Sequence, residues 1–416
     1  MSIEAPSERN SYFSLFRNRN FVALWIGQMI SFIGDYFNWL ALPILIQDLT
    51  GSTLMVGLSL ISSSVPMLVL GPVAGVFVDR WDRKKTMMTA DFLRAGLVLV
   101  CLTVQRADQV WIYYTVGFLM SCLSRFFYPA RAAVLPLIVP EKKDLLAAMG
   151  LMQGVETMGF LIGPALAGFT IGFAGAQVAF LFDSASFLLS ALAIMLMTVP
   201  RTTPGGTSSL AAVWQELREG MGTLFSSRLL VSILVLMTVL QFGLGAINVL
   251  WVPYLRTHFG VGPEGLGIVD SAQGLGMLIA TALLGYFSGR MKKAAWGAWA
   301  MMAIGLLLVG IGVSPAFVWI IVLTFVIGLF LVPGQSVLMT LIQLAVTDLK
   351  RGRVNSALNA IASAAGLISM ALASFLADTV GFRVIYGVFG MIIVAAGILG
   401  WAMLGGVDLT QVEENQ

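Results

Sequence analysis

The sequence predicts an all-α polytopic membrane protein with twelve transmembrane helices arranged as two six-helix, pseudo-symmetric bundles. Three observations predict this class: an apolar composition, twelve long apolar stretches, and positive charges confined to alternate gaps between those stretches. Only 11% of the 416 residues are charged and 58% are hydrophobic, whereas an ordinary soluble domain has about 25% charged residues. Lipid is therefore the expected solvent for most of the chain.

Each apolar stretch is long enough to cross the hydrocarbon of a bilayer, which takes about 20 apolar residues in a helix. The predicted spans are residues 21–47, 54–78, 86–105, 109–130, 145–169, 176–199, 229–254, 265–288, 294–313, 316–343, 354–377 and 382–405. This order predicts an N-terminal bundle over residues 1–200, a cytoplasmic linker with an amphipathic helix over 201–227, and a C-terminal bundle over 228–416.

Lys and Arg are distributed asymmetrically along this pattern. Of the 24 cationic residues, nineteen precede the first span or lie in even-numbered gaps, three lie in odd-numbered gaps, and Arg94 and Arg125 lie inside spans. Because cationic loops stay in the cytoplasm, both termini are expected on the cytoplasmic face of the cell inner (plasma) membrane. The net charge of +3 therefore reflects topology, and no nucleic-acid partner is expected.

Short segments recur at a nearly constant spacing in the two halves. Leu15–Arg19 recurs as Leu224–Arg228, and Gly75–Arg80 recurs as Gly285–Arg290. A duplicated six-helix unit in parallel orientation follows from this spacing. In transporters built in this way the substrate site lies at the repeat interface near the middle of the membrane.

Between the halves, residues 201–209 are rich in Thr, Gly, Ser and Pro and form the clearest linker. Over the next sixteen residues, apolar side chains from Leu210 to Phe225 fall on one helical face, with Glu216 and Glu219 on the other. This pattern predicts an amphipathic helix on the cytoplasmic membrane surface. A plain tether is the alternative.

Charged side chains inside the predicted spans are functional candidates, because each costs about 2.5–3.5 kcal/mol or more at bilayer depth. Asp35 lies near the middle of the first span and Glu156 well inside the fifth. Arg125 lies at a depth from which it could pair with either carboxylate across the bundle. We expect these three residues to couple proton binding to conformational change; a static structural role is the alternative.

Polar side chains at similar depth are expected to line a central substrate cavity. They are Gln28, Asn38, Trp39, Gln153, Gln241 and Asn248. Asp183 and Asp270 lie nearer the outer ends of their spans and rank below Asp35 as functional candidates. Proton handling is therefore expected in the N-terminal half, whereas the C-terminal half is expected to offer amides, aromatic rings and methionines to the substrate.

The segment Gly75–Lys85 reads Gly-Val-Phe-Val-Asp-Arg-Trp-Asp-Arg-Lys-Lys. It resembles the signature of the cytoplasmic loop between the second and third helices of the major facilitator superfamily. The resemblance implies that Gly75 permits close helix approach. It also implies that Asp79, with Arg80 and Arg83, forms a charge clasp that favours the outward-open state. A merely topogenic cationic patch is the alternative.

Two further features bear on this clasp. Asp79 could face the N-terminus of the eleventh span around Asn355, where the helix dipole favours an anion. Asp91 and Arg94, one turn apart in the third span, are expected to form a structural ion pair that supports the clasp. At the equivalent position of the second half the aspartate is replaced by Gly289, so any second clasp is degraded.

The fifth span carries small residues at four-residue spacing. Gly159, Gly163, Pro164 and Gly168 resemble the superfamily motif associated with antiporters, which are mostly exporters, although the closing pair is Ala-Gly here. Small residues let helix backbones approach, and a proline removes a helical hydrogen bond and makes the segment pliable. Generic helix packing would use the same residues, so both interpretations stay open.

Several segments of the N-terminal half carry a closer resemblance. They are Gly34–Tyr36, Asp48–Ser52, Asp79–Arg83, Asp91–Ala95 and Pro129–Pro136. They look like the drug/proton antiporter branch that contains macrolide-efflux proteins and the enterobactin exporter. The resemblance implies a secondary active transporter that exports an amphiphilic small molecule or drug by proton antiport and alternating access. The alternative is a lysophospholipid or nutrient carrier of the same fold that is not an exporter.

Other classes of function lack their residues. No Gly-x-Ser-x-Gly segment, Walker A loop or His cluster is present, so an enzyme is not expected. Two cysteines in adjacent spans and one histidine cannot form the usual zinc sites, so no metal, disulfide or cofactor is expected. The expected partners are protons, an amphiphilic substrate and the lipid bilayer, and the expected oligomeric state is a monomer.

Overall fold

The computed structural model describes residues 14–200, 210–287 and 295–404, and most of these lie in helices. Within these ranges, twelve helices are long and apolar enough to cross a membrane. They are α2 (Arg19–Thr50), α3 (Thr53–Val78), α4 (Arg83–Val100), α5 (Trp111–Ile138), α6 (Lys142–Ala174), α7 (Ala176–Leu196), α9 (Arg228–Phe259), α10 (Pro263–Phe287), α11 (Ala295–Gly312), α12 (Phe317–Ala345), α13 (Asp348–Val380) and α14 (Phe382–Leu404). The predicted all-α class with twelve spans is confirmed.

Polar side chains and glycine define the ends of the first two helices. The Asn18 side chain accepts hydrogen bonds from the first backbone N–H groups of α2, which otherwise lack partners. Gly51, with φ of 64°, adopts the left-handed conformation that ends α2, and Ser52 then caps α3. The turn between α2 and α3 is therefore only two residues long.

Several helices run beyond their predicted ends. α5 was expected to end at residue 130 but continues to Ile138, although it contains Pro129 and Pro136. Transmembrane helices tolerate proline because neighbouring helices can satisfy the freed backbone groups. Arg131 therefore lies inside α5 rather than in a loop, and His258, expected in an outer loop, lies in the last turn of α9.

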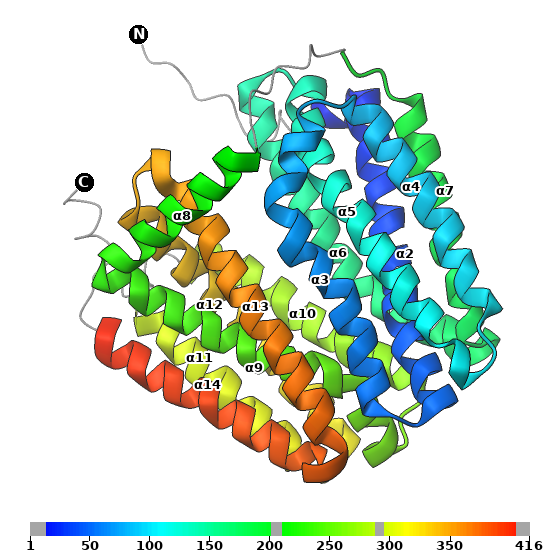
Figure 1. Cartoon of the computed structure of the whole chain (residues 1–416), viewed down its shortest axis with the longest axis vertical. Coiled ribbons are helices and arrows are strands. Elements are labelled where there is room, and N and C mark those ends of the chain that lie inside the picture. Colours follow the sequence, from blue (N-terminus) through cyan, green and yellow to red (C-terminus); the bar gives the residue numbers. More distant parts are fainter. Residues whose placement is uncertain (1–13, 201–209, 288–294, 405–416) are drawn as a thin grey trace.

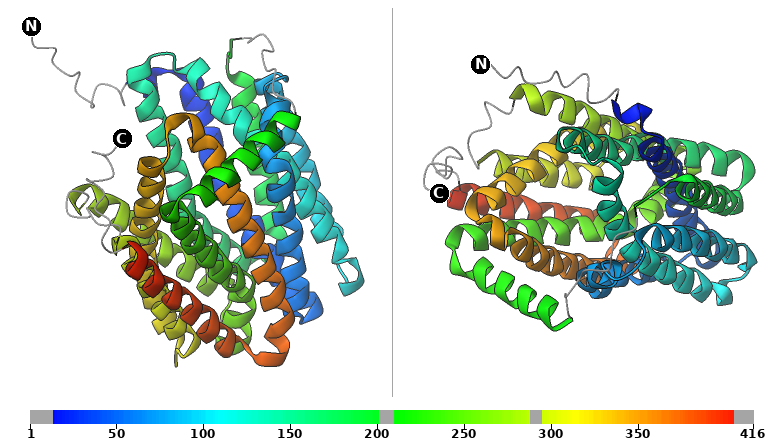
Figure 2. Two further views of the ribbon diagram at one scale, coloured as in Figure 1. Left: turned by 60° about the vertical axis from the view of Figure 1, so that its left-hand side comes forward. Right: turned by 90° about the horizontal axis from the view of Figure 1, so that it is seen from above.

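The same packing pattern occurs in both halves. In α2–α7 and again in α9–α14, the first helix packs on the fifth and sixth, the second on the fourth, and the third on the fourth and sixth. Figure 1 shows the two groups, α2–α7 and α9–α14, and Figure 2 shows them from two further directions. Between the groups, α6 packs on α10 and α3 packs on α13. The exact domain bounds stay a prediction.

The halves make close contacts on one side of the molecule, here called the distal side, on which α2 and α9 end. There Arg256 of α9 pairs with Asp48 of α2, with Nη1 and Oδ1 2.7 Å apart. Near the start of α3, a Cβ added to Gly57 would overlap Ser374 of α13. The two groups of helices are thus closed against each other on the distal side.

The remaining long helix, α8 (Leu210–Ser226), lies on the opposite side and packs on α13. Arg353 of α13 forms an ion pair with Glu219 and lies 4.0 Å from Glu216. On the apolar face Leu224 is buried, whereas Trp214 is 69% exposed. The predicted linker at 201–209 and Gly289 lie outside the described residues, and the membrane-surface position of α8 stays a prediction.

Candidate functional site

Arg131 connects three helices of the N-terminal half. Its Nη2 lies 3.0 Å from Oε1 of Glu156 on α6, and its Nη1 donates a 3.1 Å hydrogen bond to Oε1 of Gln28 on α2. Gln153, one turn before Glu156, donates to the other carboxylate oxygen at 3.1 Å. We call these four residues the Arg131 network. The Glu156 side chain is 36% exposed, so the network is open to solvent or a ligand.

The predicted pairing of Arg125 with Glu156 or Asp35 is wrong for this structure. The Arg125 guanidinium carbon lies 5.7 Å from the ring centre of Tyr128 on its own helix. Arg125 also lines a pocket of about 210 Å³ with Asn359 and Ser363 of α13. Arg125 and Arg131 lie on different faces of α5 because they are six residues apart, and Arg131 is the residue that faces α6.

A second group of charges lies between α2, α4 and α7. Asp91 and Arg94 form the predicted ion pair, with Oδ1 and Nη1 3.0 Å apart, and are 0% and 5% exposed. Asp183 of α7 is completely buried and forms no ion pair within the described residues. Asp35 interacts electrostatically with Arg94, Asp91 and Asp183. We call these four residues the acid cluster; it contains three carboxyl groups and one cation.

Close packing of α2 against α7 brings Asp35 and Asp183 together. Gly34 leaves room for α7, because a Cβ there would overlap Ser186 and lie 3.3 Å from Oδ1 of Asp183. The amide of Asn38, one turn after Gly34, interacts with Asp183, and its Nδ2 lies 3.7 Å from the sulfur of Met120. Asn38, which was predicted to line the cavity, therefore also interacts with the acid cluster.

Other predicted cavity residues have exposed side chains in the middle of their helices. Trp39 is 39% exposed and makes an edge contact with Tyr36, with ring centres 6.3 Å apart. Gln153 is exposed on α6, and Gln241 and Asn248 are exposed on one face of α9. Polar side chains at this depth usually face a water-filled cavity or the interior of the bundle rather than lipid.

Of the predicted switch residues, Gly75 and Asp79 at the end of α3 do not make the contacts that the clasp requires among the described residues. Asp79 ends α3, is exposed, and forms no ion pair in the part of the chain that the structure describes; Arg80 is also exposed. Gly75 faces open space, so it does not mediate close helix approach in this state. The resemblance links the clasp to the outward-open state, and this structure is closed on the distal side.

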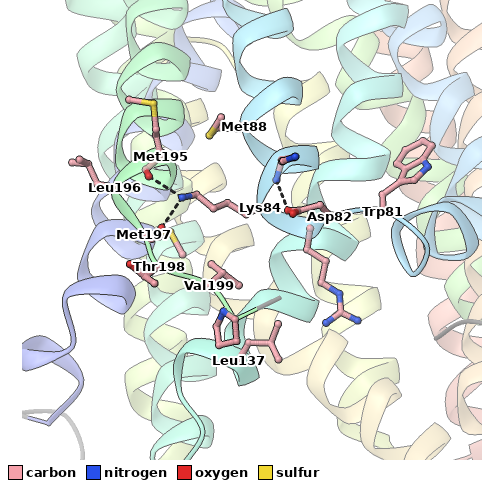
Figure 3. Close-up of a pocket in the computed structure, with 13 residues that line it drawn as sticks. Trp81, Asp82, Lys84, Met88, Leu137, Met195, Leu196, Met197, Thr198 and Val199 are labelled. Carbon is pink, nitrogen blue, oxygen red and sulfur yellow. Dashed lines mark hydrogen bonds between the residues drawn. The ribbon is translucent and has the colours of Figure 1, made fainter. Parts of the chain in front are cut away.

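Arg83 and Lys84 contribute to a pocket of about 710 Å³ at the α8-side ends of α4 and α7. Figure 3 shows Lys84 between these ends, where its Nζ donates to the carbonyl oxygens of Met195 and Met197 at 2.8 and 2.6 Å. Arg83 Nη1 lies 3.5 Å from the carbonyl oxygen of Ala133 on α5. Lys84 thus binds carbonyl groups at the C-terminal end of α7, a position that favours positive charge.

The small residues of α6 pack in two directions. Gly159 and Gly163 face α2, where added Cβ atoms would meet Phe32 and the ring of Tyr36. Pro164 and Gly168 instead face α10 of the other half; a Cβ on Gly168 would lie 2.5 Å from the carbonyl oxygen of Pro263. The antiporter-like segment therefore forms both an internal contact and the distal contact between halves.

Three residues were missed or ranked too low from the sequence. Arg131 was placed in a loop because α5 was expected to end after Pro129; the apolar residues up to Ile138 were the available signal. Asp183 and Asp270 were ranked low because they lie near helix ends, yet they are 0% and 3% exposed. Among the described residues, no group of three or more His, Cys, Asp or Glu is placed to hold a metal ion.

Comparison with known proteins agrees with this geometry. A family model of the major facilitator superfamily matches residues 24–247 and 233–414. The chain belongs to the major facilitator superfamily. Macrolide efflux protein A of Streptococcus pyogenes is 27% identical over 383 residues, which cover 91% of this chain and 94% of that protein. The multidrug efflux pump Tap of Mycobacterium bovis is 26% identical over 374 residues, covering 88% and 89%.

Solved structures show the same fold. The crystal structure of a bacterial homologue of the iron transporter ferroportin in an inward-facing state matches with a TM-score of 0.76 and 17% identity, covering 92% of this chain and 98% of that one. The protein is thus a multi-pass membrane transporter of this superfamily, with efflux pumps among its homologues, and not an enzyme.

Proposed function

We propose that this protein is a proton-coupled antiporter that exports an amphiphilic small molecule from the cytoplasm by alternating access. Its similarity to macrolide efflux protein A and to the multidrug efflux pump Tap supports the direction and the class of substrate. The distribution of Lys and Arg supports cytoplasmic termini. With that orientation the distal side is the outside of the cell, and the structure represents an inward-facing state.

The observation that carries the proposal is the composition of the acid cluster, in which three carboxyl groups share one arginine. An ionised carboxylate without a cation or water is strongly disfavoured in a buried site. Protons are therefore the ligands that can neutralise the excess carboxyl groups. Asp35 is the member next to the exposed Trp39 face of α2, so it is the group that we assign to proton exchange with the cavity.

The Arg131 network gives this proton site a neighbour that can bind substrate. Glu156 is half-exposed and shares Arg131 with Gln28, so a cationic or strongly dipolar substrate could compete for the carboxylate. The rings of Phe32 and Tyr128, whose centres lie 5.8 and 5.2 Å from the guanidinium carbon of Arg131, and the amide of Gln153 offer the mixed surface that an amphiphilic molecule needs. Loading of a proton and loading of substrate would then favour opposite states of the two halves, which is the requirement for antiport.

Transport into everted membrane vesicles with an imposed proton gradient, interior acidic, tests the proposal. The wild-type protein is expected to accumulate amphiphilic substrates, screened among macrolides, dyes, siderophores and lysolipids, only while the gradient lasts. Asp35→Asn removes the titratable group and keeps its size, so gradient-driven accumulation should fall to the level of vesicles without the transporter.

The matched control is Asp108→Asn, because Asp108 is an exposed acid that pairs with Arg106 on the surface at 3.3 Å. This variant should transport as the wild type does. Accumulation that is independent of the gradient would reject proton coupling. An unaffected Asp35→Asn variant would reject Asp35 as the coupling acid.

A further inference from the structure

The face of α10 that closes against α6 contains a buried carboxyl group. Positions at helical spacing form this face: Gly267, Asp270, Ser271 and Gly274. A Cβ on Gly267 would overlap the carbonyl oxygen of Pro164, and a Cβ on Gly274 would lie 2.9 Å from the Cα of Leu161. Asp270 therefore lies between two close contacts of α10 with α6.

Polar groups on this face bond across the closed interface or within the C-terminal half. Ser271 accepts a 3.1 Å hydrogen bond from the backbone N–H of Ala165 on α6. Asp270 Oδ1 accepts a 2.8 Å hydrogen bond from Nε1 of Trp251 on α9, whereas its Oδ2 is buried without a partner in the described part of the chain. Trp251 is itself 7% exposed and Asp270 is 3% exposed, so both side chains are shielded from bulk solvent in the closed interface.

Within the described residues, Asp270 forms no ion pair with a cation. Among titratable groups on the packed helices, Tyr36 of α2 interacts with it electrostatically. On α6, Glu156 interacts with the same Tyr36 and pairs with Arg131. α12, which also packs on α10, has no charged residue between Phe317 and Ala345.

Arg256 on the distal part of α9 does not serve as the counter-ion of Asp270 either, because it pairs with Asp48. An ionised Asp270 would thus be a buried charge with one hydrogen bond and no counter-ion, which is costly. The closed interface accommodates the neutral carboxylic acid, whereas separation of α6 and α10 would return the carboxylate to water. Closure on this side and binding of a proton by Asp270 are therefore linked.

We propose that Asp270 is a second proton-binding site, located in the C-terminal half, whose protonation allows the distal side to close. The proton comes from the aqueous phase that the open distal side admits. It returns there when the halves separate and the carboxyl group ionises. Within the proposed exporter, on whose orientation this inference rests, acid outside the cell would favour the return to the inward-facing state after substrate release.

The proposal is tested by measuring conformation rather than transport. Spin labels at Gln177→Cys and Ala316→Cys, with Cys101 and Cys122 replaced by alanine, report the distal distance between the halves by electron–electron resonance in liposomes. As pH is raised from about 5 to about 9 across the range in which a buried carboxyl group can titrate, the wild type should pass from short to long distances. Asp270→Asn, which mimics the neutral acid, should keep the short distance throughout.

A second variant keeps the carboxyl group and checks the sign. Trp251→Phe removes the hydrogen bond that stabilises the ionised form, and both residues belong to the same half, so opening should require a pH higher by about one unit. Asp108→Asn should behave as the wild type. The inference is wrong if the wild type shows no opening with pH, or if Asp270→Asn still opens.

The two proposals can fail separately. The distal distance could respond to pH through Asp270 while transport in vesicles does not depend on the proton gradient. That result would support Asp270 as the proton site of the distal closure and reject proton-coupled export. Conversely, export could depend on the gradient and on Asp35 while the distal distance does not change with pH. That result would support proton-coupled export and reject Asp270 as the proton site of the distal closure.

Discussion

Arg94 is the single cation of the acid cluster, and among the three carboxyl groups it forms an ion pair with Asp91. Besides the 3.0 Å ion pair, its guanidinium carbon lies 4.7 Å from the ring centre of Phe127 and 5.5 Å from that of Phe187. Asp91→Asn would leave a buried cation without its partner. We expect the free energy of unfolding to fall by about 3–5 kcal/mol, measured by reversible unfolding in detergent micelles.

A double substitution separates the cost of a lone charge from the worth of the pair. Asp91→Leu combined with Arg94→Met removes both charges and should destabilise less than Asp91→Asn alone, since no unpaired ion remains. A loss below about 1 kcal/mol for Asp91→Asn would contradict the expectation. It would indicate that Asp35 or Asp183 neutralises Arg94 instead.

Sequence reasoning found the residues of the site more readily than their partners. Asp35 and Glu156 could be identified because an acid in an apolar span is costly wherever it points. The partner of Glu156 could not, because the choice between Arg125 and Arg131 depends on which face of α5 turns toward α6. Asp183 was ranked low for a related reason: its burial depends on packing by other helices, not on its depth along α7.

At the scale of helices, α6 shows how small residues control the contact between halves. Gly168→Ala would bring Cβ to 2.5 Å from the carbonyl oxygen of Pro263 and 3.0 Å from the Cα of Gly267. These are backbone atoms that cannot rotate away, so α6 and α10 must separate. We expect closure of the distal side to weaken by about 1–3 kcal/mol, seen as a larger fraction of long distances between the same spin labels.

Gly154→Ala is the matched control on the same helix, because a Cβ there meets no atom within 4 Å. Alanine at that position should leave the distance distribution unchanged and slightly stabilise α6, since glycine in a helix costs about 1 kcal/mol relative to alanine. Equal effects of the two substitutions would show that helix propensity, rather than contact with α10, determines the result.

The helices themselves were largely predictable, whereas their ends were less so. Twelve apolar stretches separated by charged or turn-forming residues are a strong signal, and Gly51 and Ser52 end one helix and start the next as their chemistry requires. α5 extends past its predicted end because Pro129 does not break a helix that neighbouring helices support. The extension by eight residues is what moved Arg131 from a loop into the site.

At the scale of the whole molecule, the duplicated sequence predicts two similar bundles, and the same helix pairs pack in each. What the sequence could not predict is the relative position of the bundles, because alternating access requires two arrangements of similar free energy. The contacts that distinguish this arrangement lie on the distal side: the glycines of α6 and α10, the contact of Gly57 with Ser374, and the pair Asp48–Arg256.

The pair Asp48–Arg256 is the ionic part of that closure. Its atoms lie 2.7 Å apart, but the side chains are 51% and 24% exposed, and Arg256 also donates to the carbonyl oxygen of Ile44 at 3.2 Å. Partly exposed pairs contribute about 0–1 kcal/mol. Arg256→Gln should therefore raise the ratio of open to closed distal sides by no more than about fivefold, a smaller effect than that of Gly168→Ala.

The exchange of the two charges tests whether attraction across the interface is the cause. Asp48→Arg alone should open the distal side because two cations would then face each other, and adding Arg256→Asp should restore closure apart from the lost bond to Ile44. The difference between these variants should shrink as salt is raised to about 1 M, where the screening length is near 3 Å. Two results would contradict this expectation: closure in the double variant that does not change with salt, or a double variant that is as open on the distal side as Asp48→Arg alone. Either would mean that apolar contact and the glycines of α6 and α10 close the distal side without a contribution from this pair.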